Sequence, residues 1–420
     1  MPEIPSRRAV LAAAGSLALL FSTTPGTVDA LPDLSPGGWP AAAAPGPAQV
    51  TACAPPGGGG LNAGIPTASR FARSHGTVTA LTLFIDFPGS EARVSTEERF
   101  AEFFPATRQY FATSSHGRLD YRPEPVHRWL RMSQPFESYG IDRGVGWHPA
   151  DPDGYNRLVR EIAEAVRDEV DFSAHDLVNV LAAPHAGPSA VEKVLSVSFP
   201  GRPLLHTPTG PVQNISFIWS RQPGDSPHRV LVHENGHAFG LPDLYWTAPG
   251  EAPLLAGHWD VMEQDWGPSN DFLAWHKWKM EWLTPDQVDC VAGPGVTEHL
   301  LSPGGEPGGT KLVAIRTGRH EVLTAEVRAR SELDRMVCRP GVLLTRVNTA
   351  VSTGEGPARV IDSTPDSGGC QSLPDPQVTA ELTDAPFLPG ETFRDREAGV
   401  RVDVLEAKDD GSHRVRITHD

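Results

Sequence analysis

The stretch HENGHAFGLPDLY, residues 233–245, limits what this chain can fold into more than any other part of the sequence. Apolar residues flank it at helical spacing, and Gly240 predicts the end of the helix. With 3.6 residues per turn, His233 and His237 lie about one turn apart on one face, so both imidazoles can reach one ion. Glu234 is rotated by about 100° from His233 and can reach a water molecule on that ion as a general base.

The residues on either side of this helix extend the pattern. Ser226 is a good N-cap, and Pro227 suits the first helical position. After the helix, a tight turn at Gly240 lets Asp243 return as a third ligand and leaves the fourth position of a tetrahedral zinc site open. An open position is typical of catalytic zinc, so we expect one catalytic Zn²⁺. The alternative is a pair of histidines on an ordinary helix surface.

Length and charge narrow the possible partners. A chain of 420 residues can bury a core without a metal, so a bound metal is expected to be functional. A formal net charge of -16 repels nucleic acid and anionic lipid, and no tract rich in lysine and arginine offsets it. We therefore expect no nucleic-acid partner, whereas the oligomeric state stays open.

The N-terminus has the pattern of an export signal. Arg7 and Arg8 precede an apolar run from Ala9 to Phe21, which is shorter than the roughly 20 residues that span a bilayer. Cleavage is predicted after Ala30, and the paired arginines favour twin-arginine export over the general secretory route. We expect a signal peptide over residues 1–30 and a secreted protein without a stable membrane anchor.

The four cysteines suit an oxidising compartment. They can form two disulfides in three pairings, and sequence separation favours Cys338 with Cys370 over pairs that include Cys53 or Cys290. Cys53 lies in a stretch rich in Pro, Ala and Gly, residues 31–69, which predicts a linker or short propeptide of which little packs. A Cys53 thiolate that binds the zinc and keeps an enzyme latent is the alternative to a disulfide.

Strands and helices alternate before the motif, which predicts a mixed α+β domain over residues 70–287. The expected helices lie in STEERFAEFFPATRQYFATSS, which Pro105 divides, and in GYNRLVREIAEAVRDEV, whose apolar residues fall on one face. The expected strands are Val78–Phe87, Leu177–Ala183 and Asn214–Ser220.

The character of the chain changes after the motif region. Short β-rich runs separated by Gly, Pro and Asp turns predict a β-sandwich-like domain over residues 288–420. Whether this domain supports the first one or binds a substrate or cell wall stays open. The cluster DPDG at residues 151–154 is compatible with a Ca²⁺ site and equally with a solvated turn.

At the motif the chain resembles the immune inhibitor A (M6) family of secreted zinc metalloproteases, which are zincins with the pattern H-E-x-x-H-x-x-G-x-x-D. GHWDVM at residues 257–262 is similar to the family's W-D-x-M segment, and residues 268–283 are similar to its P-S-x-x-x-A-W-x-K stretch. Weaker similarity upstream extends the resemblance over residues 78–283. The small snapalysins share the motif, but this chain is far longer than theirs.

The resemblance implies a zincin-like fold and a secreted endopeptidase that acts on proteins or peptides. Its zinc ligands would be His233, His237 and Asp243, and Glu234 would be the base that activates a zinc-bound water. Met262 would lie in a turn beneath the metal. Tyr245 would steady the oxyanion, although a packed aromatic at the helix exit is an alternative. Many zincins carry a tyrosine two residues after the methionine, where this chain has Gln264.

Other residues and other functions are alternatives to this zinc protease interpretation. His258 and His276 could touch a substrate, but we expect both to be hydrogen-bonded structural histidines. The alternatives to a protease are a catalytically silent secreted binding or adhesion protein on a protease fold, and a zinc amidase that acts on cell-wall peptides. An intact Glu234 favours an enzyme, because a binding protein does not need that base.

Overall fold

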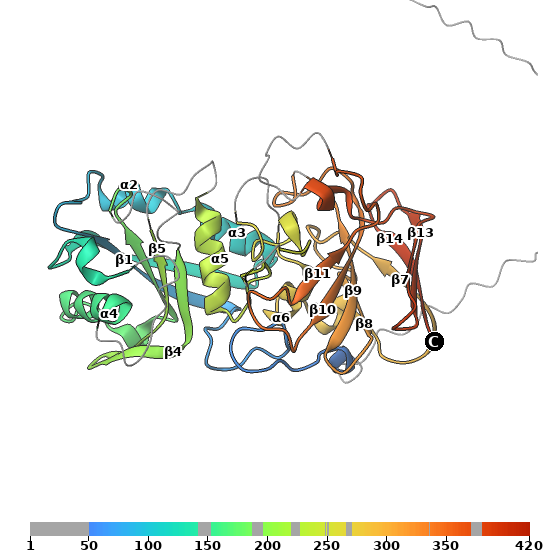
Figure 1. Cartoon of the computed structure of the whole chain (residues 1–420), viewed down its shortest axis with the longest axis horizontal. Helices are drawn as coiled ribbons and strands as arrows, with labels where there is room; N and C mark the ends of the chain where they lie inside the picture. The colour runs from blue at the N-terminus through green and yellow to red at the C-terminus, as the bar shows by residue number, and fades with distance from the viewer. Residues whose placement is uncertain are drawn as a thin grey trace, which may run out of the picture. The chain divides into compact units, whose positions relative to one another are not determined.

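The computed structural model describes residues 50–141, 153–186, 196–219, 227–247, 249, 252–265, 271–335, 337–370 and 380–420. Within these ranges the fold is mixed α+β, with three sheets and a few short helices, which agrees with the predicted class (Figure 1). The predicted signal peptide, residues 31–49, Ser226 and the first two residues of DPDG lie outside the described ranges. The predicted domain boundaries remain predictions.

The first sheet has the strand order β2-β1-β3-β5-β4. β1, β2, β3 and β5 run parallel, whereas β4 pairs antiparallel with β5 and forms one edge. The strands are β1 (Gly76–Asp86), β2 (Leu119–Arg131), β3 (Leu177–Ala182), β4 (Val197–Thr207) and β5 (Gly210–Ile218). The three strands predicted here are confirmed, with small shifts at their ends.

Helices cover both faces of this sheet, as is usual for parallel strands. Phe84 of β1 joins the apolar core beneath α3 and α5, whereas its neighbours Leu83 and Ile85 join the core beneath α4. Figure 1 shows α4 and α5 on opposite sides of the sheet. The helices are α2 (Thr96–Ala101), α3 (Ala106–Ser114), α4 (Gly154–Ala165), α5 (His228–Ala238) and α6 (Ala274–Lys279).

The two predicted helical segments are present. Pro105 separates α2 from α3, as expected, and Ser95 begins α2 with a capping box to Glu98. α4 presents the predicted apolar face to the sheet but ends at Ala165, before the apolar pattern does; Val170 is still buried beyond the helix.

The chain after residue 287 forms two sheets that share one apolar core, which is the predicted sandwich-like arrangement. The first has the order β11-β10-β9-β8-β6 and the second the order β12-β13-β14-β7. The strands are β6 (Val288–Val291), β7 (Gly295–Leu301), β8 (Leu312–Arg316), β9 (Glu321–Arg328), β10 (Gly341–Asn348), β11 (Ala358–Ile361), β12 (Thr392–Asp395), β13 (Val400–Ala407) and β14 (His413–His419).

Part of the segment before β1 packs against the rest of the fold, so the expectation that little of residues 31–69 packs is wrong at its buried residues, although about half of residues 50–69 are exposed. Cys53 and Ala63 are fully buried. The backbone carbonyls of Ala63 and Gly64 accept hydrogen bonds from Trp275 Nε1 at 2.8 Å and Lys279 Nζ at 2.6 Å. A segment with few apolar side chains is thus held through its carbonyl groups, which composition does not reveal.

Two disulfides tie the chain. Cys338 pairs with Cys370, as sequence separation favoured, and Cys53 pairs with Cys290. The alternative in which Cys53 binds zinc is therefore wrong, because its sulfur is already bonded to another sulfur. The disulfides agree with the predicted extracellular location.

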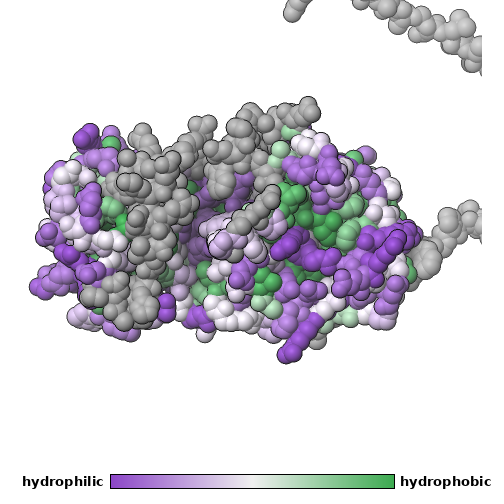
Figure 2. Space-filling model, viewed as in Figure 1, coloured by the Kyte–Doolittle hydropathy of each residue, from purple (hydrophilic) through white to green (hydrophobic). Residues whose placement is uncertain are grey.

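The described surface offers no large apolar face. Among the described residues, the large hydrophobic side chains that are exposed are Leu254, Val296 and Leu300. On the face seen in Figure 2, hydrophobic residues occur in small patches between hydrophilic ones. Within the same residues, each helix is too short or too polar to cross a bilayer.

Candidate metal centre

The motif lies on α5 and the turn that follows it. The helix begins at His228, one residue after the predicted start, with Pro227 as its N-cap. It ends at Ala238, and Gly240, with a φ of +88°, lies in the turn that stops the helix, as predicted. The N–H of Leu241 donates to the carbonyl of Gly236 at 2.9 Å, which closes the helix with a Schellman turn. A side chain at Gly240 would also collide with Thr67, so both conformation and space require glycine.

Two backbone carbonyls orient the histidines. Nδ1 of His233 lies 2.9 Å from the carbonyl of Val261, and Nδ1 of His237 lies 2.9 Å from the carbonyl of Leu241. A carbonyl only accepts hydrogen bonds, so each Nδ1 carries a proton, and each Nε2 faces Asp243, where it can hold either a proton or a metal ion. The turn that ends the helix thus also fixes the second histidine.

The two Nε2 atoms and one carboxylate oxygen converge on the same place. Asp243 Oδ1 lies 3.2 Å from His233 Nε2 and 3.1 Å from His237 Nε2. Among the residues that the structure describes, this buried oxygen has no hydrogen-bond partner. Ligands of a tetrahedral zinc ion with bonds of about 2.0–2.1 Å are separated by about 3.3 Å, which is close to these distances.

The electrostatics of this cluster favour a positive charge between its members. Burial opposes the charged imidazolium, yet the contact with Asp243 raises the pKa of His233 to about 10. Burial would raise the pKa of Asp243, but the two histidines hold it well below its ordinary value. Two imidazole nitrogens and one carboxylate oxygen are also ligands that zinc accepts. Donor set, geometry and field therefore fit a zinc ion held by His233, His237 and Asp243.

Glu234 lies buried beside the three candidate ligands. Ser198 Oγ of β4 is 2.7 Å from Glu234 Oε2 and 2.8 Å from the Glu234 carbonyl, and Ser216 Oγ of β5 lies 2.7 Å from Ser198 Oγ. Burial raises the pKa of Glu234. The sequence did not predict Ser198, because a serine in a strand 36 residues before the motif carries no local signal.

A buried polar network fastens α5 to the sheet. Asn235 accepts a hydrogen bond from Tyr121 Oη at 2.7 Å and donates to Asn179 Oδ1 at 2.9 Å, and Asn179 Nδ2 donates back to Tyr121 Oη at 2.8 Å. Each of the three side chains is fully buried. Such a closed network holds the helix in one register, and with it the residues on its opposite face.

The segment around Met262 packs directly beneath the motif helix. A Cβ on Gly236 would lie 2.5 Å from Met262 Sδ, so the glycine between the two histidines makes room for this methionine. Asp260 shapes the turn, because its carboxylate accepts hydrogen bonds from the N–H of Met262 at 2.7 Å and from His276 Nδ1 at 2.8 Å.

His258 and Tyr245 are placed differently from the ligands. His258 is fully buried beside Trp259, and burial lowers its pKa to about 3, as suits a neutral structural histidine. The ring of Tyr245 stacks on His233 at 6.1 Å. Burial and the negative charge of Asp243 raise the pKa of Tyr245, so its hydroxyl keeps its proton near neutral pH. The structure thus sets Tyr245 next to two candidate ligands.

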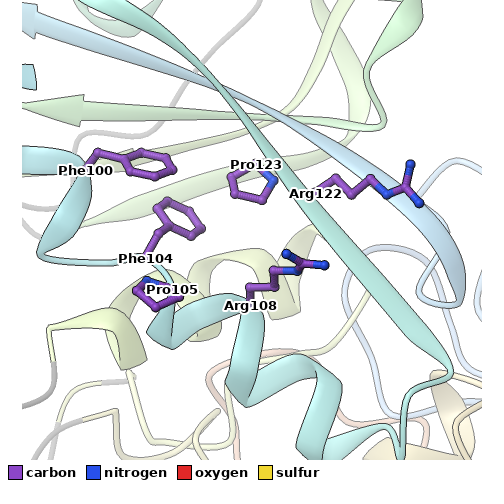
Figure 3. Close-up of a pocket in the computed structure, with 6 residues that line it drawn as sticks. All are labelled: Phe100, Phe104, Pro105, Arg108, Arg122 and Pro123. Carbon is purple, nitrogen blue, oxygen red and sulfur yellow. The ribbon is translucent and has the colours of Figure 1, made fainter. Parts of the chain in front are cut away.

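A separate cavity of about 570 Å³ lies between β2 and the region of α2 and α3. Figure 3 shows its lining of Phe100, Phe104, Pro105, Arg108, Arg122 and Pro123. Two phenylalanines, two prolines and two arginines do not form a metal or acid–base site. This cavity does not include any of the candidate ligands His233, His237 and Asp243.

Comparison with known proteins adds little. No family model matches the chain, and no curated protein matches it. One solved structure, catalytically inactive OgpA from Akkermansia muciniphila in complex with an O-glycopeptide substrate, aligns over 86% of this chain and 99% of its own with 10% identity. The TM-score is 0.29, which is too low to support an argument about fold or function. The candidate site therefore rests on its own residues.

Proposed function

We propose that this protein is a secreted zinc endopeptidase of the M6 type. The observation that carries the proposal is the convergence of His233 Nε2, His237 Nε2 and Asp243 Oδ1 next to the buried carboxyl group of Glu234. A structural zinc site would need four protein ligands, whereas the described residues supply three. Three ligands and an adjacent carboxylate are typical of a hydrolytic zinc site.

The residues of the chain divide the chemistry between them. When bound, zinc would polarise the scissile carbonyl and make water more acidic. Glu234 would take a proton from the attacking water and deliver it to the leaving amine. Ser198 holds Glu234 Oε2, so we assign the transferred proton to Oε1. Tyr245, protonated and next to Asp243, would donate a hydrogen bond to the oxyanion.

A single experiment separates this function from the alternatives. The chain starting at Leu31 is assayed for casein cleavage, and its zinc content is measured on the same sample, beside the isosteric variant Glu234→Gln. We expect cleavage that a chelator stops. The variant is expected to keep its zinc and lose about 10²–10⁴-fold in rate, because only the general base is removed. Glu124→Gln, an exposed glutamate on β2, is the matched control.

The other outcomes point to specific alternatives. If both proteins hold zinc and neither cleaves casein, but wild type hydrolyses cell-wall peptides, the protein is an amidase. If it holds zinc and cleaves neither substrate, the silent binding protein is the better description. If wild type holds no zinc, the ligand assignment itself is wrong.

A further inference from the structure

The β-rich region after residue 287 reaches back to the metal centre through the loop between β10 and β11. Thr353 and Gly354 of this loop engage three polar groups of Asp243. The N–H of Asp243 donates to Thr353 Oγ1 at 2.8 Å, and Thr353 Oγ1 donates to Asp243 Oδ2 at 2.9 Å. The N–H of Gly354 donates to the Asp243 carbonyl at 3.2 Å.

We propose that Thr353 is a positioning residue of the metal centre, which selects the oxygen of Asp243 that binds zinc. This inference rests on the proposed zinc site. A carboxylate offers two equivalent oxygens, and the Thr353 hydroxyl occupies Oδ2. Oδ1 then faces the two histidine nitrogens. Asp243 is thereby fixed as a ligand through one oxygen.

A threonine hydroxyl suits this task because it accepts one hydrogen bond and donates another at the same time. By accepting from the Asp243 N–H and donating to Oδ2, it ties the carboxylate to its own backbone and fixes the side-chain torsions. The bond to Oδ2 is charge-assisted, which makes it stronger than a neutral one. Hydrogen bonds to a metal ligand commonly decide how well the ligand holds the ion.

The loop itself is held from two sides. Thr353 N–H donates to the carbonyl of Leu61 at 3.3 Å, so the segment tethered by the Cys53–Cys290 disulfide supports it from one side. On the other side, the N–H of Thr247 donates to the carbonyl of Gly354 at 2.8 Å. Gly354 has a φ of +74°, and a side chain there would collide with Thr247. Thr353 is therefore presented to Asp243 by a backbone with little freedom.

The test measures zinc affinity by competition with a chromophoric chelator, on purified full-length mature chain at one pH. Thr353→Val removes the hydroxyl at nearly constant volume and is expected to weaken zinc binding about 10- to 100-fold. Thr353→Ser keeps the hydroxyl and is expected to restore most of the affinity. Thr345→Val, a buried threonine of β10 whose hydroxyl lacks a hydrogen-bond partner within the described residues, is the matched control and should match wild type.

The outcomes separate this inference from the proposed function. If wild type binds zinc and Thr353→Val binds it equally well, Thr353 has no positioning role, and the endopeptidase proposal is untouched. If Thr353→Val weakens zinc and Thr353→Ser restores it, the role holds even for a chain that cleaves nothing. If Thr353→Val does not fold, Thr353→Ala must show the same loss, and normal affinity in that variant overturns the inference. Absence of zinc from wild type overturns both proposals.

Discussion

Two clusters of buried charge lie in this molecule, and they are built on opposite principles. In the candidate metal centre, His233, His237 and Asp243 direct two imidazole nitrogens and one carboxylate oxygen at one point. In the other cluster, at the start of α6 and the end of β9, cations face anions. Arg328 donates to Glu326 at 3.0 Å and to Asp334 at 2.8 Å. Lys277 also pairs with Asp271.

The two clusters differ in whether their buried carboxylates already pair with a lysine or arginine. In the Arg328 cluster every carboxylate pairs with a cation, because Arg328 serves both Glu326 and Asp334 and Lys277 serves Asp271. The cluster encloses a space of only about 10 Å³, at the lower limit for one water molecule.

In the candidate metal centre, by contrast, Asp243 Oδ1 faces two imidazole nitrogens, and Asp243 pairs with no lysine or arginine among the described residues. Burial and charge alone therefore do not single out a candidate site. What distinguishes the His233, His237 and Asp243 cluster is that a buried carboxylate faces two imidazole nitrogens and pairs with no lysine or arginine among the described residues.

Removal of one ligand should have the largest effect. His237→Ala is expected to abolish stoichiometric zinc binding and all hydrolysis, because two ligands hold zinc poorly. Zinc content and casein cleavage measure this. His299→Ala removes a histidine that pairs with Asp289 at 2.7 Å outside the centre and should keep its zinc. Retention of zinc by His237→Ala would contradict the ligand assignment.

Removal of the central cation from the other cluster should affect stability and leave metal binding intact. Arg328→Met leaves Glu326 and Asp334 without their partner, and we expect the free energy of unfolding to fall by about 3–5 kcal/mol. Urea denaturation measures the loss. Adding Glu326→Gln and Asp334→Asn should recover part of it. Weakened zinc binding in folded Arg328→Met would show that the two clusters are coupled. That result would contradict the separation of a stabilising cluster from a metal-binding one.

The buried ammonium group of Lys279 donates to the Gly64 carbonyl and has no carboxylate partner among the described residues. Burial lowers the pKa of Lys279 to about 8 from 10.5. Between these pH values the unfolded chain binds the proton and the folded chain does not, so this group makes the fold more stable as pH rises from about 8 to 10.5. The free energy of unfolding of wild type should therefore rise by about 3 kcal/mol relative to that of Lys279→Met as the pH rises over that range. A constant difference in urea denaturation would contradict the shifted pKa.

The smallest effect is expected at Ser198, next to the candidate base Glu234. Ser198→Ala removes the hydroxyl that holds Glu234 Oε2, and we expect kcat to fall about 10- to 100-fold, with zinc content and KM unchanged, because one hydrogen bond to a charged group is worth about 1.5–3 kcal/mol. Ser216→Ala, which contacts Ser198 and not the carboxylate, should have a weaker effect. An equal fall in both variants would indicate that the β4–β5 hairpin acts as a structural support only.

Local patterns in the sequence were sufficient to predict much of this structure. The spacing of His233 and His237, the glycine that ends α5 and the division of α2 from α3 at Pro105 each depend on neighbouring residues. For such features, propensity and periodicity indicate the structure directly. The three candidate ligands lie within eleven residues, and the structure brings their ligand atoms to within 4.8 Å of one another.

The parts that the sequence did not predict depend on contacts between distant residues. Thr353 and Ser198 are common residue types on a loop and a strand, and only the folded chain brings them to Asp243 and Glu234. The segment around Cys53 has the composition of a linker, yet Trp275 and Lys279 bind its carbonyls from more than 200 residues away. A single sequence does not carry these pairings.

The large sequence separation between Asp243 and Thr353 also determines when their contacts can form during synthesis. Thr353 follows Asp243 by 110 residues. At roughly 5–20 residues per second, a ribosome needs about 5–20 s to add them. During that interval the nascent chain already contains the complete motif but not the loop that holds Asp243. Under the proposed function, the candidate site can therefore be completed only several seconds after its three ligand residues have been synthesised.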